Sequence, residues 1–264
     1  QGSAKSTTAT LLGQLIDPGA TPLQALPGNE KALLAAADQQ HVLAFDNAST
    51  LSLAMSDALC RLSTGAGRVA KVEKQEIAGT FHRPVILTGI PDVIRRPDLA
   101  DRALRIRLAP INQVARRTQT DVQTAFAADH PRLLGALLDA AALGLHRLPD
   151  ETGALPRMAD FARWVLACAP SFTNTDHLRA LLQANALSVS GDILVESPLG
   201  AALCRLLDET SEWTGTATRL LAALRHVMPK GGGKLPATPE RLSRGLREIE
   251  EDLRRHGVTI EKRR

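Results

Sequence analysis

The residues near the start of the chain are of the types that bind the phosphates of a nucleotide. Residues 2–7 follow the second half of the pattern GxxxxGK[ST], in which a turn, a Lys and a hydroxyl residue precede a helix. The N–H groups of such a turn bind phosphate oxygens, the Lys neutralises the β- and γ-phosphates, and the hydroxyl binds Mg²⁺. Ala4 occupies the place of the pattern's second glycine, and we expect the first glycine to precede residue 1. The sequence therefore predicts an ATP and Mg²⁺ site formed by Gly2, Ser3, Ala4, Lys5, Ser6 and Thr7, with Ser6 as a metal ligand.

A carboxylate placed after an apolar run is the second candidate metal ligand. Residues 41–45 predict a buried strand, and Asp46 follows them directly. Asp46 can hold the water shell of Mg²⁺ opposite Ser6, or it can simply cap a turn; beside the phosphate loop, the metal role is favoured. Asn47 stands where most ATPases of this kind carry an acidic residue. Its amide can orient the attacking water but cannot take its proton, so we expect slow hydrolysis or a base from elsewhere.

Two further residues are candidates for the same reaction. Thr88 follows a second predicted strand, residues 84–87, where its hydroxyl can sense the γ-phosphate or help to hold the water. The alternative is a hydroxyl that only satisfies the backbone at a strand end. Arg102 can reach the γ-phosphate of a neighbouring subunit and stabilise charge in the transition state. Other arginines crowd around it, so a solvated surface role stays open.

The elements that must position these residues predict an α/β arrangement in residues 1–110. A third strand is expected at residues 103–108, where apolar and polar residues alternate before Pro110. Helical periodicity dominates from about residue 113 to residue 208. We therefore divide the chain into an ATPase core (1–110), a helical domain (111–210) and a C-terminal module (211–264).

The C-terminal module predicts a helix, a loop, a second helix and a strand, which is the outline of a winged helix. The second helix begins at Thr238 as N-cap and ends at Gly257, and the strand covers residues 258–260. Its basic residues are candidates for DNA contact, although acidic neighbours weaken the field and a solvated face is the alternative. The DNA-binding candidates here are Arg241, Arg244, Arg247 and Lys262.

In their order along the chain, these motifs resemble those of the superfamily 3 helicases and the related primase-helicases of phages and poxviruses, which belong to the AAA+ group. In that family a Thr-Gly-Gly-like turn with basic residues lies between the nucleotide motifs and the sensor strand, and residues 62–67 stand in its place. The resemblance implies a hairpin that tracks DNA and carries Lys71 and Lys74; a basic surface loop explains these lysines equally well. The chain departs from the family at Asn47 and at Thr88, where the family usually has Asn. Residues 84–90 and 157–162 also resemble uncharacterised ATP-binding proteins of bacterial mobile elements.

The resemblance implies an AAA+-like P-loop NTPase core, an all-α region and a winged-helix module similar to those of phage primase-helicases. It implies an ATPase that acts as a helicase-like motor on DNA in the replication of a phage or mobile element. A homo-oligomeric ring, hexameric in the family, and a primase partner are implied as well. Two alternatives stay open: a DNA-binding regulator that uses ATP only as a switch, and a P-loop kinase of a small molecule. The second is disfavoured by the basic end of the chain.

Composition sets the remaining limits. The chain has 264 residues, a net charge of +4 and 44% hydrophobic residues, which is typical of a folded protein that tolerates a polyanionic partner. The three cysteines are far apart and predict neither a disulfide framework nor a zinc site. No run reaches the roughly twenty apolar residues of a membrane span. These features predict a cytoplasmic protein.

Overall fold

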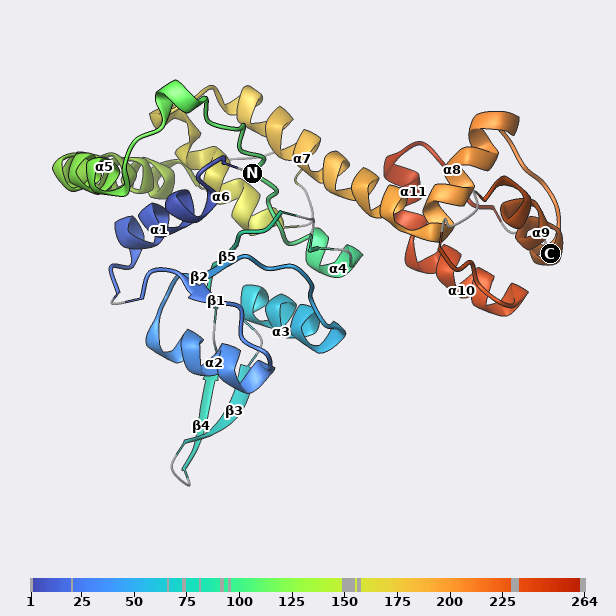
Figure 1. Cartoon of the computed structure of the whole chain (residues 1–264), viewed down its shortest axis with the longest axis horizontal. Helices are drawn as coiled ribbons and strands as arrows, with labels where there is room; N and C mark the ends of the chain where they lie inside the picture. The colour runs from blue at the N-terminus through green and yellow to red at the C-terminus, as the bar shows by residue number, and fades with distance from the viewer. Residues whose placement is uncertain are drawn as a thin grey trace. The chain divides into compact units, whose positions relative to one another are not determined.

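A computed structural model describes the chain as two compact units, the first of residues 1–94 and 105–180 and the second of residues 95–104 and 181–264. Figure 1 shows the path of the chain through its helices and strands. The predicted helical domain, 111–210, contributes residues to both units. The residues described are 2–19, 21–65, 67–72, 75–80, 82–90, 93–94, 96–148, 155, 158–228 and 233–261.

A small parallel sheet lies in the first unit, with the strand order β1-β2-β5. Its central strand is buried: Leu43, Ala44 and Phe45 each expose 3% of their surface or less. Two of the predicted strands are confirmed, since β2 overlaps residues 41–45 and β5 overlaps residues 84–87. The strands are β1 (Gln24–Ala25), β2 (Leu43–Asp46) and β5 (Val85–Leu87).

Three helices accompany this sheet in the sequence. Two of them have N-caps that explain where they begin: the side chain of Asn29 accepts a hydrogen bond from the N–H of Ala32, and that of Ser52 accepts one from Met55. The helix α3 ends at Gly65, which adopts the left-handed conformation with φ 75°. The helices are α1 (Lys5–Ile16), α2 (Glu30–Gln39) and α3 (Leu53–Thr64).

An antiparallel hairpin follows α3. Its strands are β3 (Gly67–Val72) and β4 (Gln75–Thr80), and their register runs from Gly67 opposite Thr80 to Val72 opposite Gln75. Lys71 is paired with Glu76, one step before the last pair. A hairpin therefore stands where the family resemblance implies one.

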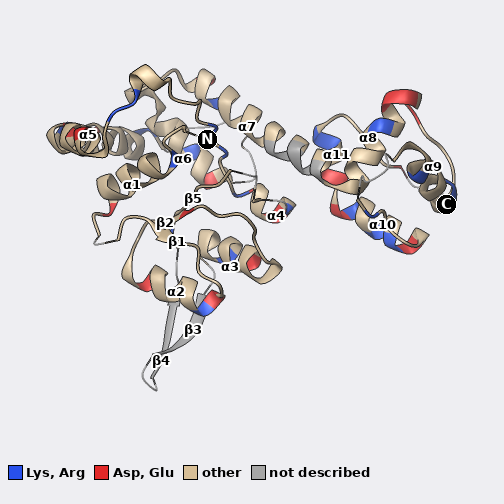
Figure 2. Ribbon diagram, in the orientation of Figure 1, with Lys and Arg blue, Asp and Glu red and all other residues tan. Residues whose placement is uncertain are grey.

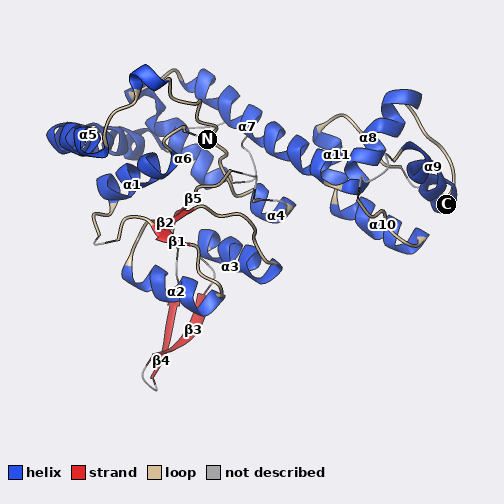
Figure 3. Cartoon of the chain, viewed as in Figure 1, coloured by secondary structure: helices blue, strands red, loops and turns tan. Residues whose placement is uncertain are grey.

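The expected fold class is wrong. Most of the described residues are helical, and their parallel sheet has three short strands, so the fold is mostly helical and is not an α/β P-loop core (Figure 3). The third predicted strand, residues 103–108, has no strand conformation. Its Leu104 and Ile106 are 50% and 74% exposed. An alternating sequence forms a strand only where its backbone pairs with a neighbouring strand. In the described sheet β5 is an edge strand, and residues 103–108 do not pair with it.

The rest of the first unit is helical, as the periodicity predicts. The long helix α5 packs against α6, and a close approach occurs at Gly144. A Cβ there would lie 2.3 Å from Cys168 Sγ, so only glycine fits. The elements are the 3-10 helix η1 (Gln113–Ala115), α5 (Gln119–Arg147), α6 (Ala159–Cys168), η3 (Ala169–Ser171) and the start of α7 (Thr175–Glu196).

The second unit has a core of leucines contributed by helices. Thr238 caps α10 by accepting a hydrogen bond from the N–H of Arg241, as predicted, although the expected single helix breaks at Ile249 into two. The helices are α4 (Pro97–Ala100), α8 (Pro198–Thr210), α9 (Ala217–Val227), α10 (Pro239–Glu248) and α11 (Glu250–Arg255). The buried core residues are Leu194, Leu199, Ala202, Leu203, Leu206, Leu221, Leu224, Leu242, Leu246, Ile249 and Leu253.

The strand predicted for the winged helix is also wrong, because residues 258–260 form no strand. The N–H of Val258 donates to the carbonyl of Leu253, which turns the chain back onto α11. Val258 and Ile260 then pack against the leucine core. Their apolar side chains are partly buried by helices and not by a paired strand.

Among the helices that the structure describes, none has the length and apolar character needed to cross a membrane.

Candidate functional site

The turn that precedes α1 offers backbone donors to an anion. Gly2 has φ 82° and Ala4, at the N-cap of α1, has φ 53° and ψ 33°. No side chain caps this helix, and its first turn holds no acidic residue. The first N–H groups of a helix have no partner within the helix. The start of α1 therefore presents donors and a positive dipole end to whatever binds at residues 2–7.

The side chain of Lys5 adds a full positive charge to this turn. Lys5 is half-buried at the first position of α1, and its Nζ lies 3.4 Å from Ser3 Oγ. Ser3 itself is 9% exposed. The contact holds the ammonium group beside the turn rather than in bulk solvent.

Asp46 joins the turn to the sheet. Ser6 Oγ donates a hydrogen bond of 2.8 Å to Asp46 Oδ1, and Thr88 Oγ1 donates to the same carboxylate oxygen. The parallel register of β2 and β5, with Phe45 opposite Leu87, explains this, because Asp46 and Thr88 each come next along neighbouring strands. Three of the predicted residues therefore meet at one point.

Hydrogen bonds keep the Asp46 carboxylate ionised. Its pKa is lowered, and the largest cause is the hydroxyl of Thr88. Burial acts in the opposite direction, while Ser6, the N–H of Asn47 and the charge of Lys5 lower the pKa further. The site thus combines a carboxylate, two hydroxyls and an ammonium group, which are the groups that bind a metal ion and phosphates.

Asn47 turns the chain away from β2. It has φ 52°, a left-handed conformation that Asn adopts more readily than most residues. Its N–H donates to Thr88 Oγ1 at 3.2 Å, and the N–H of Ala48 donates to the Thr88 carbonyl. Thr88 therefore satisfies the backbone, which is one of the two roles considered from the sequence, and its hydroxyl also donates to the Asp46 carboxylate.

Sequence reasoning missed a contact between the turn and a distant segment. The N–H of Ile111 donates to the carbonyl of Gly2 at 2.9 Å, and Arg116 Nη2 lies close to Gly2. The segment that carries both residues had no motif to mark it, and only the fold brings it to the turn.

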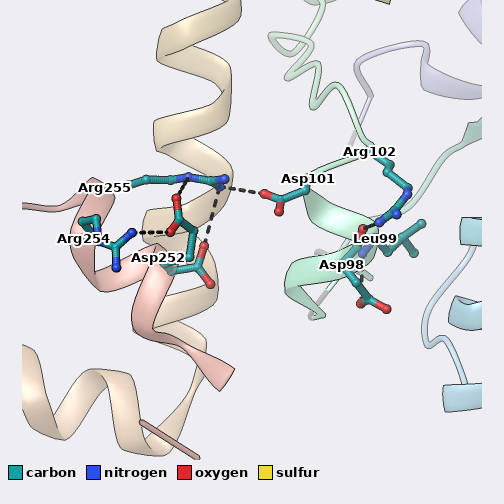
Figure 4. Close-up of polar contacts among 8 residues, drawn as sticks. Asp98, Leu99, Asp101, Arg102, Asp252, Arg254 and Arg255 are labelled. Carbon is teal, nitrogen blue, oxygen red and sulfur yellow. Dashed lines mark hydrogen bonds and ion pairs between the residues drawn. The ribbon is translucent and has the colours of Figure 1, made fainter. Parts of the chain in front are cut away.

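Arg102 is not part of the set formed by Ser6, Asp46 and Thr88. It belongs to the second unit, and its Nη1 donates to the carbonyl of Asp98 at the start of α4 (Figure 4). The preceding residue, Asp101, accepts a 2.6 Å hydrogen bond from Arg255 Nη1 on α11. The segment that bears Arg102 is thus tied to the C-terminal helices by a salt bridge.

The predicted DNA-binding arginines lie together on α10. All three are exposed, on the side of the helix opposite the buried Leu242 and Leu246. Acidic residues share the helix (Figure 2), and Glu240 and Glu248 are exposed as well. Lys71 lies on β3, whereas Lys74 and Lys262 are outside the described residues. The arginines are Arg241, Arg244 and Arg247.

Within the described ranges, no group of three or more His, Cys, Asp or Glu side chains is placed to hold a metal ion. A cation at Ser6 and Asp46 would therefore take its remaining ligands from phosphate oxygens and water. This is how Mg²⁺ usually binds beside a nucleotide.

The fold and the site define a mostly helical protein with backbone donors at the start of α1 and exposed arginines on α10. Residues 1–188 match the family model of the actinomycete integrative conjugative element replication protein, and residues 199–264 match that of the AICE RepA C-terminal domain. The chain belongs to this family of replication proteins. Neither the curated proteins nor the solved structures gave a match. The predicted link to replication of a mobile element is confirmed.

Proposed function

We propose that this replication protein binds Mg·ATP at residues 2–7 and Asp46, and hydrolyses it to drive a helicase-like motor on the DNA of the element. The observation that supports the proposal most is the meeting of Ser6 and Thr88 on the Asp46 carboxylate, 2.8 Å from Ser6 Oγ. A bare helix start binds many anions. A helix start beside an ionised carboxylate and an ammonium group favours an anion that arrives with a divalent cation.

The residues present fit such a ligand. The uncapped N–H groups of α1 and the Lys5 ammonium would bind the phosphates, and the Ser6 hydroxyl and Asp46 would hold Mg²⁺ with its water. Bound Mg²⁺ would supply neutralisation of the charge that develops on the phosphates. Thr88 keeps Asp46 ionised and aimed at Ser6. Asn47, exposed at the same strand end, would orient water without removing its proton.

The remaining parts of the motor come from outside this set. The exposed arginines of α10 would contact DNA phosphates, because guanidinium groups bind the backbone without reading sequence. By the resemblance, Lys71 of the β3/β4 hairpin would be a further DNA contact. Arg102 would reach the nucleotide of a neighbouring subunit in a homo-oligomeric ring, a hexamer by the resemblance to superfamily 3 helicases. A primase would be a further partner.

The second candidate function is an ATP-switched DNA-binding protein with little hydrolysis. Asn47 favours it, because the residue beside Asp46 carries an amide where a carboxylate would take the proton from water. In that case ATP would favour one conformation without being consumed.

The experiment measures ATP binding and DNA-stimulated ATP hydrolysis by the full-length protein, its Lys5→Ala variant and its Lys31→Ala variant. Lys5 makes one long hydrogen bond, to Ser3, so the loss of its side chain should leave the fold intact. Lys31 is an exposed lysine on α2 and serves as the matched control for the loss of one charge.

Turnover that rises with DNA, vanishes in Lys5→Ala and persists in Lys31→Ala supports the motor. ATP binding without turnover, lost in Lys5→Ala only, supports the switch. If the unaltered protein binds no ATP, or if both variants behave alike, the nucleotide site is refuted.

A further inference from the structure

The phosphate-binding turn is in contact with a second segment of the chain, and this contact brings a second cation to it. A Cβ built on Gly2 would lie 3.3 Å from Arg116 Nη2. The hydrogen bond of 2.9 Å from the Ile111 N–H to the Gly2 carbonyl anchors the same segment to the turn. One hydrogen bond therefore anchors this segment to Gly2, and it places the guanidinium of Arg116 close to the same residue.

The path between these contacts is fixed by local structure. The side chain of Asn112 accepts a hydrogen bond from the N–H of Val114 and caps the short helix η1, which ends just before Arg116. The side chain of Thr118 then caps α5 by accepting from the N–H of Asp121. In turn, α5 packs against α1, the helix that follows the phosphate-binding turn. The segment before α5 is thus bonded to Gly2 at Ile111, and α5 itself packs against α1, which begins at Lys5.

We propose that Arg116 is a second phosphate-binding residue of this site and contacts the polyphosphate of a nucleoside triphosphate from the Gly2 side. Among the residues that the structure describes, its exposed guanidinium has no carboxylate and no hydrogen-bond partner. A guanidinium presents a planar fork of donors that matches two phosphate oxygens. Lys5 supplies its positive charge from the start of α1, and Arg116 supplies another from the segment anchored at Gly2.

This role also explains the value of glycine at position 2. The φ of 82° favours glycine, and a side chain there would stand in the space next to the guanidinium. A larger residue would push Arg116 away from the turn, even if the backbone conformation were kept.

The inference rests on the proposed nucleotide site, and its test separates the two. Dissociation constants for ATP, inorganic tripolyphosphate and adenosine are measured by calorimetry on the full-length protein and on Lys5→Ala, Arg116→Ala and Arg117→Ala. Arg117→Ala is the matched control, because this substitution removes the same charge one residue away. The Nη2 of Arg117 donates to the Asp121 carbonyl at 3.3 Å. Circular dichroism checks that each variant keeps its helices.

We expect Arg116→Ala to weaken ATP and tripolyphosphate binding by about ten- to a hundredfold, as is usual for a lost charge-assisted contact, with adenosine unaffected. Arg117→Ala should change either affinity less than about twofold, as expected of an exposed charge outside the site. If Arg116→Ala binds ATP as tightly as the unaltered protein, or no more weakly than Arg117→Ala, the role of Arg116 is refuted while the nucleotide site stands. If the unaltered protein binds neither ATP nor tripolyphosphate, the nucleotide site itself is refuted, and Arg116 with it.

Discussion

Two neighbouring arginines of α11 should differ sharply in what they contribute to the second unit. Arg255 Nη1 lies 2.6 Å from Asp101 Oδ1, and the two side chains are 24% and 8% exposed. It also lies 3.8 Å from the buried carboxylate of Asp252 (Figure 4). Arg254, one residue earlier, pairs with Glu250 and Glu251 but is 62% exposed. The adjacent positions therefore give a matched pair of variants.

Burial lowers the pKa of Arg255, but the hydrogen bond and the charge of Asp101 outweigh it and raise the pKa. Replacing Arg255 with Gln removes this cation from the carboxylates of Asp101 and Asp252. Removal of one partner of a buried pair costs about 3–5 kcal/mol, and the partial exposure of Arg255 reduces our expectation to about 2–4 kcal/mol. Arg254→Gln removes only exposed ion pairs and should cost less than about 1 kcal/mol.

Amide hydrogen exchange followed by mass spectrometry measures the loss of stability helix by helix. A local measurement is needed because a chain of two units need not unfold in one step. In Arg255→Gln, amides of α4 and α11 should exchange roughly thirtyfold to several-hundredfold faster, whereas those of α2 should not change. The effect should persist in 0.5 M salt, since buried pairs are screened little. Equal exchange in the two variants, or an effect that salt removes, would refute the reasoning.

Two shorter predictions concern the turn before α1 and the hydrogen bond between Thr88 and Asp46. Ala4→Gly should stabilise the protein by about 1 kcal/mol, because Ala4 holds a left-handed φ of 53° that costs a residue with a Cβ about that much; an unchanged or lower urea midpoint would contradict this. Thr88→Val should raise the pKa of Asp46 toward its ordinary value, because Thr88 is the largest cause of the lowered pKa, and a carboxyl ¹³C titration would show it. Since the folded-state pKa of Asp46 lies below its unfolded value, the stability that Asp46 contributes is present above the unfolded pKa and is lost as pH falls through the folded one. The variant should lose less stability on acidification than the unaltered protein, and an equal loss would count against the hydrogen bond.

Local signals in the sequence predicted much of the site. A hydroxyl and a Lys before an apolar helix, and polar residues after two apolar runs, were enough to predict α1, β2 and β5 and to bring Ser6, Asp46 and Thr88 together. Each of these signals lies within one turn of helix or one strand. The N-cap at Thr238 and the buried stripe through Leu242 and Leu246 were predicted for the same reason.

The errors concern partners that lie far away in the sequence. Residues 103–108 and 258–260 have strand-like composition, but a strand also needs a neighbour with free backbone groups, and periodicity carries no information on where that neighbour is. Val258 and Ile260 are partly buried against helices instead. Likewise, no local pattern could place Arg116 beside Gly2 or the Arg102 segment with the C-terminal helices.

Because the fold is mostly helical, only part of the functional proposal stands without the resemblance to superfamily 3 helicases. The set formed by Ser6, Asp46 and Thr88 needs only one helix start and the ends of two neighbouring parallel strands, and the structure has all three. A mostly helical chain with three short strands meets that need as well as a larger sheet would, because hydrogen bonds between β2 and β5 alone fix the spacing of Asp46 and Thr88. The ring and the role of Arg102 have no such local support, since both depend on neighbouring subunits. Nucleotide binding is therefore the part to test first, and the motor should be judged only after it.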